Sequence, residues 1–375
     1  MKVVLLGAGA SKCAGYPLAS QLMSTLMVWA QQSHDLSVQN DWRTWILFRE
    51  NTKGLVRLLL DDPNPEIALS LLDLCDSSSS SGLAAIKPER RDDAISQSLS
   101  SNVFLEEYFL TPAHEEAFRA AYARNALLRC LSTFFLEKHA DDGETTSRKR
   151  RRYLRDLLSS LHPDDVIITL NWDTTVERTL LEEGRWNPRD GYGFKRPLRP
   201  LREPEAGVEW TAQSQVTVLK LHGSVGWHRS ERRGLYFDNS QYLAAFPLAS
   251  SSAQMVDPSD QEFGPPDEHL LIHPSFLKDL GAPEIRKIWD RAAAALRKAD
   301  AVDVWGYSLP KSDHAVRALI FPLRRRLEEG RRSLTVTVHD PSGETLDRWR
   351  QLLGEKLRLR RGTIGCEESR VVGPS

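Results

Sequence analysis

The sequence has little cysteine, almost no net charge and no long apolar run. Its four cysteines, Cys13, Cys75, Cys130 and Cys366, lie far apart and none belongs to a C-x-x-C pair. That argues against a structural zinc site and against a disulfide framework. The net charge is −1, so no overall field attracts nucleic acid or an anionic membrane. No stretch reaches the length of a membrane span, and no cleavable signal precedes the first strand pattern. We therefore expect a cytoplasmic protein with no metal, no membrane contact and no direct nucleic-acid binding.

The chain is long enough for a substantial core. It has 375 residues, of which 41% are hydrophobic and 27% are charged, as in globular proteins. From residue 41 the apolar spacing stays helical for over a hundred residues, with no convincing strand pattern. We expect one domain over residues 1–375, with a helical insertion over 41–161 and a disordered tail over 365–375. The basic run 148–155 is interpreted as a solvated face rather than a nucleic-acid contact.

The first apolar run ends in a loop of small residues. Residues 3–6 read as a buried strand, and they are followed at once by Gly7, Ala8, Gly9, Ala10 and Ser11. Because glycine has no Cβ, the backbone N–H groups of such a loop can close on a pyrophosphate. Lys12 stands where the third glycine of a G-x-G-x-x-G series would fall. The loop alone therefore leaves nucleotide binding and a structural turn equally open.

Further strand patterns end in small, polar or ionisable side chains. The segments 166–170, 216–221, 301–305 and 334–339 are rich in β-branched and aliphatic residues. They are followed by Asn171 and Asp173, by His222 and Ser224, by Ser308, and by Asp340. Carboxyl ends of parallel strands share one edge of a sheet, and ligands bind there where the strand order reverses. We predict an α/β, Rossmann-like open parallel sheet with helices on both faces and a site at that edge.

Taken in order, these segments resemble the motif set of sirtuin-like NAD-consuming domains. The matching segments are 7–11 (GAGAS), 169–173 (TLNWD), 221–224 (LHGS) and 306–310 (GYSLP) with Asp313. They are most similar to the bacterial branch found in anti-phage defence systems. The similarity runs from residue 2 to about residue 340 and leaves out the helical insertion and the proline- and arginine-rich loop 191–215.

The resemblance implies NAD+ as the bound molecule, with Asn171 and His222 as the catalytic pair. Together with the strand-end positions it assigns the cofactor contacts to Gly7, Ala8, Gly9, Ala10, Ser11, Pro17, Thr169, Asp173, Gly223, Ser224, Gly306, Tyr307, Ser308, Asp313 and Asp340. The chemistry of the pair agrees. An Asn amide can orient water or a ribose hydroxyl, and a His with a near-neutral intrinsic pKa can take up the proton.

Departures from the protein-deacylating sirtuins point to a different acceptor. Those enzymes carry paired cysteines on a zinc module, and they have an acid and an arginine after the proline of the ribose-covering stretch. Here no cysteines are paired, and Leu18, Ala19 and Ser20 follow Pro17. Water is then the natural nucleophile, so the expected reaction is hydrolysis of NAD+ to ADP-ribose and nicotinamide.

Structural roles compete with the functional ones at single positions. Taken alone, Asn171 would favour a turn and His222 a buried structural histidine. Asp313 is equally suited to capping the helix that follows it, and Asp340 to closing a turn. Only the recurrence of such residues at strand ends favours a site.

The leading functional hypothesis is an NAD+ glycohydrolase that acts as the toxic effector of a defence system. Such an enzyme would be held inactive until triggered, so we expect a homo-oligomer and a separate sensor, such as an ATP-driven translocase or an Argonaute-type protein. One alternative is a regulatory module that binds NAD or ADP-ribose. Others are an ADP-ribosyl-transferring or deacylating sirtuin relative, and an oxidoreductase that would rest on the glycine loop alone.

Overall fold

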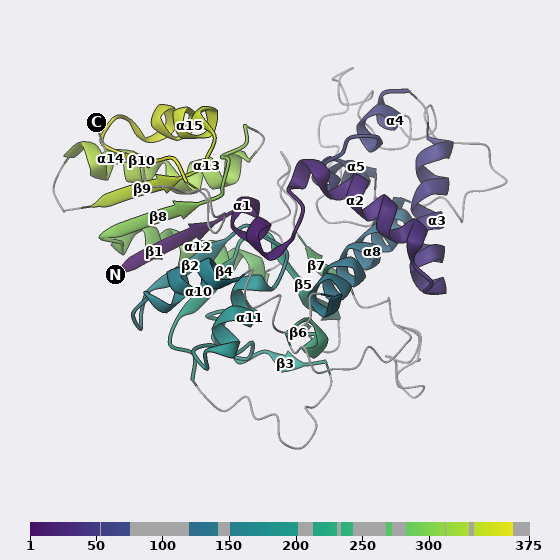
Figure 1. Ribbon diagram of the computed structural model, residues 1–375, viewed down its shortest axis with the longest axis horizontal. Helices are drawn as coiled ribbons and strands as arrows, with labels where there is room; N and C mark the ends of the chain where they lie inside the picture. Colours follow the sequence, from purple (N-terminus) through teal and green to yellow (C-terminus); the bar gives the residue numbers. More distant parts are fainter. Residues whose placement is uncertain are drawn as a thin grey trace, which may run out of the picture.

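The computed structural model describes most of the chain (Figure 1). The described residues are 1–52, 54–75, 120–141, 151–201, 213–230, 234–242, 268–271, 283–311, 313–329 and 334–362. The predicted disordered tail, 365–375, and the middle of the predicted helical insertion lie outside these ranges. Within them, no helix is both long enough and apolar enough to cross a membrane.

A six-stranded parallel sheet forms the centre of the molecule. Its strands are β1 (Lys2–Leu6), β2 (Val166–Thr169), β4 (Thr217–Lys220), β8 (Ala301–Trp305), β9 (Thr335–His339) and β10 (Arg358–Arg360). Their order is β10-β9-β8-β1-β2-β4, so the chain builds the sheet outward from β1 first on one side and then on the other. The order reverses between β1 and β8, the switch point at which doubly wound sheets bind ligands. The predicted Rossmann-like fold class is confirmed.

The sheet is buried because its central strands are apolar on both faces. All of Val3–Leu6 is inaccessible to solvent, as is expected for a parallel strand covered by helices on either side. The covering helices are α10 (Arg152–Ser159), α11 (Thr175–Glu182), α12 (Pro283–Lys298), α13 (His314–Ile320), α14 (Pro322–Glu329) and α15 (Gly343–Leu353). Since parallel crossovers are right-handed, the helices that follow β1 and β2 lie on the opposite face from those that follow β8 and β9.

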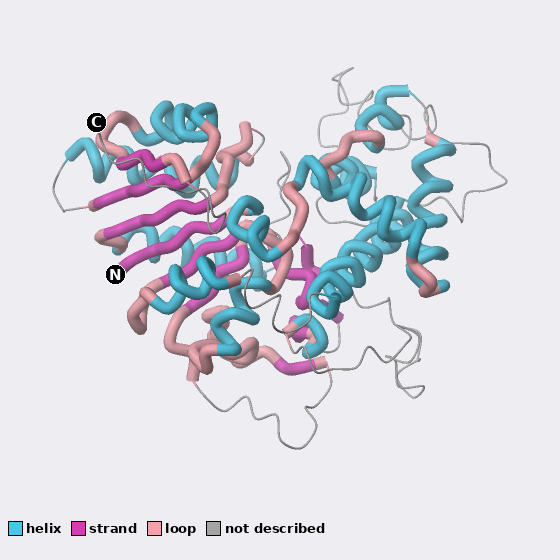
Figure 2. The backbone as a smooth tube through the Cα atoms, in the orientation of Figure 1, coloured by secondary structure: helices cyan, strands magenta, loops and turns pink. Residues whose placement is uncertain are grey.

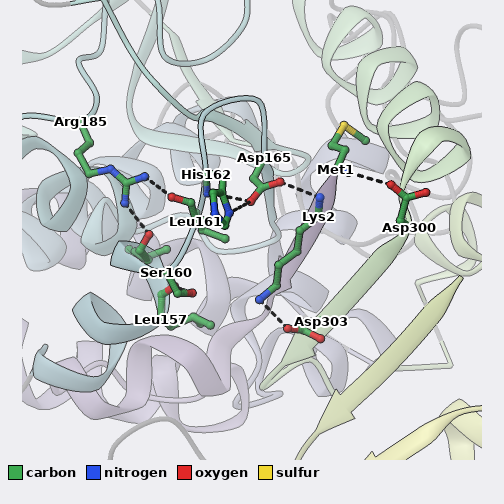
Figure 3. A network of polar contacts seen from close by, with 11 residues as sticks. Met1, Lys2, Leu157, Ser160, Leu161, His162, Asp165, Arg185, Asp300 and Asp303 are labelled. Carbon is green, nitrogen blue, oxygen red and sulfur yellow. Dashed lines mark hydrogen bonds and ion pairs between the residues drawn. The ribbon is translucent and has the colours of Figure 1, made fainter. Parts of the chain in front are cut away.

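Polar contacts fix the amino-terminal end of β1 between its neighbours (Figure 3). The Lys2 N–H donates to Asp165 Oδ1 at 2.7 Å, just before β2, and Lys2 Nζ lies 2.8 Å from Asp303 Oδ2 in β8. The Met1 amino group lies 2.9 Å from Asp300 Oδ2. These contacts set the register of β1 at the end opposite its glycine loop.

A second, smaller sheet follows β4. It has the order β3-β6-β5-β7 and consists of β3 (Arg199–Pro200), β5 (Gly223–Ser230), β6 (Gly234–Phe237) and β7 (Glu268–Leu271). Strands β5 and β6 form an antiparallel hairpin, and β5 also pairs with β7. Only two residues separate β4 from β5, and one of them is His222, which therefore lies at the junction of the two sheets.

The remaining helices form a group beside the sheets (Figure 2). They are α2 (Ala19–Gln32), α3 (Leu36–Asn51), α4 (Gly54–Leu60), α5 (Pro65–Cys75) and α8 (Ala120–Asp141). Their apolar side chains make a core separate from that of the large sheet, and this core also takes in Tyr16, Trp172 and Val225. The helical group therefore packs directly against the chain segments next to Asn171 and Ser224. Helix α10, by contrast, buries Leu154 and Leu158 in the sheet core.

Candidate functional site

The glycine loop after β1 packs against the loop after β8. The Gly9 N–H donates to Gly306 O at 2.9 Å. A Cβ on Gly7 would lie 2.6 Å from Gly306 O, and a Cβ on Gly306 would lie 2.4 Å from the Ala10 nitrogen. Gly306 also has a φ of +61°, which favours glycine. The need for glycine at these positions is thus explained by the approach of two backbones at the switch point of the sheet.

A single helical turn, α1 (Ala8–Ser11), begins inside the glycine loop, ahead of the longer helix α2. The Gly7 N–H donates to Trp305 O and the Ala10 N–H to Gly7 O. With Gly9 bound to Gly306, three of the loop's amides are engaged within the protein. The pyrophosphate contact of this loop stays a prediction.

Asn171 joins the end of β2 to the glycine loop. Its side-chain Nδ2 donates to Gly7 O at 3.0 Å and to Ser11 Oγ at 2.9 Å, and the residue is buried. Gly7 O can only accept, so the orientation of the amide is determined by its partner. Both amide hydrogens are then used, and Oδ1 is the atom through which Asn171 can act on a bound molecule.

The turn that carries Asn171 is held by its neighbours. The Asn171 N–H donates to Thr169 Oγ1 at 3.1 Å, and Asp173 Oδ1 accepts from the Thr175 N–H at 2.9 Å. Asp173 therefore begins helix α11 by bonding the backbone two residues on, a common role for Asp before a helix. Thr169 and Asp173, both predicted to contact the cofactor, shape the turn between β2 and α11.

His222 faces an acid from the loop after β8. Its Nε2 lies 3.6 Å from Asp313 Oδ2, and both side chains are almost fully buried. The same carboxylate oxygen accepts from the Tyr307 hydroxyl at 2.7 Å, while Asp313 Oδ1 accepts from the Val316 N–H at 3.3 Å. Asp313 is thus the cap of α13 and the partner of His222 at once, so the two roles left open by the sequence coexist.

The residues after His222 belong to the second sheet. Gly223 begins β5 and pairs with Leu271 of β7. Ser224 is fully buried, and its Oγ accepts from the Gly226 N–H at 3.3 Å. The predicted contact of Ser224 with a cofactor therefore competes with a partner inside the protein.

The predicted contacts after β8 and β9 lie along the same edge of the sheet. Ser308 is exposed, and its carbonyl accepts from Arg348 Nε at 2.9 Å. Asp340 is buried, and its Oδ1 accepts from the Ser342 N–H at 2.9 Å, so it closes the turn before α15. Burial raises the pKa of the Asp340 carboxyl, while the hydrogen bond from Ser342 and the charge of Arg348 oppose the rise. Pro17, in the segment between α1 and α2, is half-buried.

The structure brings the central predicted residues into one chain of contacts. Asn171 bonds Gly7, Gly7 packs on Tyr307, Tyr307 bonds Asp313, and Asp313 faces His222. These residues follow strands β1, β2, β4 and β8, which are adjacent in the sheet. The arrangement provides an amide oxygen and an imidazole–carboxylate pair, the groups that position and deprotonate a hydroxyl or water. Asp340 follows β9, one strand further along.

A buried polar cluster that the sequence patterns did not predict lies beneath this edge. Lys220 is the last residue of β4, and its Nζ lies 2.8 Å from Glu177 Oε1 of α11, with both side chains inaccessible to solvent. Glu177 Oε1 also accepts from the Tyr192 hydroxyl at 3.1 Å. A lysine inside the apolar run 216–221 was the available signal, since lysine is almost never fully buried without a partner.

Comparison with known proteins finds similarity only at the level of structure. No family model matches the chain, and no curated protein matches it. Among solved structures, one described as "Sir2-p53 peptide-NAD+" is similar over 97% of this chain and 88% of its own, with 12% identity and a TM-score of 0.34. Two others are described as "The Structural basis for Sirtuin Substrate affinity" and "The Structural basis of Sirtuin Substrate Affinity". Each is 12% identical over 97% of this chain and 88% or 89% of its own, with TM-scores of 0.34 and 0.33.

Proposed function

We propose that the protein is an NAD+ glycohydrolase, which splits NAD+ into nicotinamide and ADP-ribose. The observation that carries the proposal is the position of Asn171, whose amide is fixed by Gly7 O and Ser11 Oγ at the switch point of the sheet. An amide fixed by two hydrogen bonds presents its oxygen in one orientation. It is thereby suited to hold a ribose hydroxyl or a water beside the reacting carbon.

The pair of His222 and Asp313 supports the same reaction. Cleavage of the bond between nicotinamide and ribose gives the ribose carbon oxocarbenium character, and attack by water releases a proton. We assign that proton to His222, and the carboxylate of Asp313, 3.6 Å away, would stabilise the resulting imidazolium. Tyr307, bonded to Asp313 Oδ2, would hold the carboxylate in place.

The overall reaction consumes one water. NAD+ and water give nicotinamide, ADP-ribose and one proton, and the pyridinium loses its positive charge as the bond to the ribose breaks. The residues carried over from the resemblance complete the proposed site. Asp173 and Asp340 are candidates for ribose hydroxyls, because a carboxylate can accept two hydrogen bonds.

The test is product analysis of NAD+ incubated with the pure protein. We expect nicotinamide and ADP-ribose to appear in equal amounts, and both Asn171→Ala and His222→Ala to lower their production by at least about 100-fold. Because the enzyme is proposed to need a trigger, the assay is run alone, at concentrations that favour assembly, and with the product of a neighbouring gene. If NAD+ binds but is never cleaved under these conditions, the protein is a binding module. Transfer of ADP-ribose to protein, or release of an acylated product from an acyl-lysine peptide, would indicate a transferase or deacylase.

The cellular role proposed for this activity is that of a defence effector which depletes NAD+ when assembled or contacted by a sensor. Large apolar side chains are exposed on the helical group, among them Val28, Leu36 and Leu58. Contiguous exposed apolar patches mark sites of protein association, and we propose the surface of the helical group as the contact site on this ground. The helical group also packs against Trp172, next to Asn171. A partner that binds the helical group and shifts it would therefore move the turn that carries Asn171.

A further inference from the structure

One buried lysine contacts the turn that carries Asn171. Lys220 Nζ donates to the backbone carbonyl of Asp173 at 2.6 Å and lies 2.8 Å from Glu177 Oε1. Lys220 and Glu177 have no exposed surface. Lys220 is also the second residue before His222, at the point where β4 ends. One side chain thus ties the end of β4 to the turn after β2.

The cluster extends from Lys220 to the other side of His222. Glu177 Oε1 accepts from the Tyr192 hydroxyl, which lies 2.8 Å from the Tyr242 hydroxyl. The Tyr242 hydroxyl in turn packs on β5, since a Cβ on Gly226 would lie 2.6 Å from its oxygen. The chain of polar contacts that begins at the Asp173 carbonyl therefore ends against the strand that follows His222.

Stability alone does not account for this cluster. Burying a lysine and a carboxylate costs several kcal/mol per ion, and replacing such a pair with apolar residues is often neutral or stabilising. The neighbouring residues of β4, Val218 and Leu219, show that the strand accommodates apolar side chains at this depth. Burial raises the pKa of the Glu177 carboxyl despite the nearby Lys220, and among the described residues Glu177 Oε2 has no hydrogen-bond partner.

We propose that Lys220 and Glu177 are positioning residues, which hold the turn of Asn171 and the turn of His222 in the relative arrangement that cleavage of NAD+ requires. This inference rests on the proposed function. Lys220 acts through the backbone carbonyl of Asp173, and Glu177 acts by fixing Lys220. Because a misplacement of about 1 Å can lower a rate by about 100-fold, small shifts of either turn would lower kcat.

The experiment uses three variants of the full chain. Lys220→Met removes the donor to the Asp173 carbonyl and leaves the Glu177 carboxyl buried without its ion-pair partner. Glu177→Gln keeps the lysine but removes the charge of its partner. The double variant, Lys220→Met with Glu177→Gln, removes both charges. We expect Lys220→Met and the double variant to lower kcat about 100-fold with a much smaller change in KM, and Glu177→Gln to have a weaker effect in the same direction. The double variant keeps the test available if Lys220→Met alone fails to fold.

The control is Val336→Ala, which creates a cavity in β9 at a buried position away from the cluster. Hydrogen exchange of the amides of 172–175 is measured in parallel, and we expect it to rise in Lys220→Met but not in Val336→Ala. If Val336→Ala and the double variant have the same stability and lose the same amount of kcat, the cluster has only a structural role. Unchanged kcat together with unchanged amide exchange of 172–175 in the double variant would likewise rule out a positioning role.

The two proposals fail in different ways. If the wild-type protein releases no nicotinamide, the hydrolase proposal fails, while the amide exchange of 172–175 still reports whether Lys220 fixes the turn. If the wild type hydrolyses NAD+ and the double variant does so at the same kcat, only the positioning role fails.

Discussion

Asp313 Oδ2 faces His222 Nε2 across 3.6 Å, although the two residues belong to loops that follow different strands of the sheet. The contact depends on β8 and β4 ending at the same edge, with β1 and β2 between them. An acid beside a histidine orients its ring and stabilises the imidazolium that forms when the histidine takes up a proton. The sequence indicated both residues separately, and their pairing became apparent only in the fold.

Substitution of Asp313 by Asn separates its two roles. Asn is as good a helix cap as Asp, so the bond to the Val316 N–H can be kept while the charge facing His222 is lost. We expect Asp313→Asn to lower the free energy of unfolding by about 1–3 kcal/mol, because one amide oxygen cannot accept from both the Val316 N–H and the Tyr307 hydroxyl. We also expect it to slow nicotinamide release by about 10- to 1,000-fold. Chemical denaturation and product analysis measure the two effects.

Asp35→Asn is the matched control for that substitution. Asp35 caps α3 by accepting from the Ser37 N–H at 2.8 Å, and it is exposed at the start of a helix that belongs to the helical group. The variant Asp35→Asn should leave both the free energy of unfolding and the rate of nicotinamide release nearly unchanged. Wild-type release by Asp313→Asn would show that the carboxylate does not assist His222.

The fold class followed from local patterns, and the polar residues at strand ends followed from the same patterns. Asn171 and His222 stood out because each comes directly after an apolar run that could only be a buried strand. The contacts that decide their environment are non-local. The glycine at 306 is required by the backbone at residues 9 and 10, and the partner of Lys220 lies on a helix that precedes it. These contacts between distant residues depend on the order of the strands and on the rotation of the helices about their axes. Neither can be predicted from the spacing of residues along the chain.

Substitution of Gly306 by Ala tests the contact between the two loops. A Cβ there would lie 2.4 Å from the Ala10 nitrogen, and the φ of +61° adds strain. We expect Gly306→Ala to destabilise the protein by about 2–4 kcal/mol, the sum of overpacking and a left-handed backbone. It should also weaken NAD+ binding, because the glycine loop would be displaced. Thermal unfolding and isothermal titration with NAD+ measure these changes.

Gly184→Ala isolates the backbone component. Gly184 has a φ of +66°, and apart from its chain neighbours no atom of the described residues lies within 4 Å of the position its Cβ would take. Its cost should be only about 1–2 kcal/mol, with NAD+ binding unchanged. If both alanine variants lost the same stability, the close approach of the loops at Gly306 would not be a constraint in solution.

Removal of the Asn171 side chain should affect folding as well as chemistry. Asn171→Ala leaves Gly7 O and Ser11 Oγ without their partner in a buried setting, which costs about 1–3 kcal/mol. Ser11→Ala removes one acceptor and leaves the bond to Gly7 intact, so we expect a loss of about 0.5–1.5 kcal/mol. Urea denaturation of the two variants and of the wild type gives both values. Equal losses would mean that the bond to Gly7 contributes nothing.

His339 should make stability depend on pH below neutrality. Its ring stacks on Trp305 with centroids 3.7 Å apart, and burial lowers its pKa from 6.5 to about 4, with Asp303 opposing the shift and Arg360 and Lys2 adding to it. The unfolded chain therefore binds a proton between pH 6.5 and 4 while the folded protein does not. The stability present above pH 6.5 is lost as the pH falls toward 4. Because His339 is only partly buried, we expect a loss of about 1–2 kcal/mol rather than the full linkage value.

The replacement His339→Phe keeps an aromatic ring beside Trp305 and removes the titrating group. Other groups that titrate in this range are shared with the wild type, so they cancel when the two urea unfolding curves are compared at pH 7.5, 5.5 and 4.5. We expect the wild type to lose about 1–2 kcal/mol more than His339→Phe on acidification. The variant His34→Gln, at an exposed position in the segment before α3, should follow the wild type. An equal loss in wild type and His339→Phe would mean that the imidazole is protonated as readily in the folded protein as in the unfolded chain.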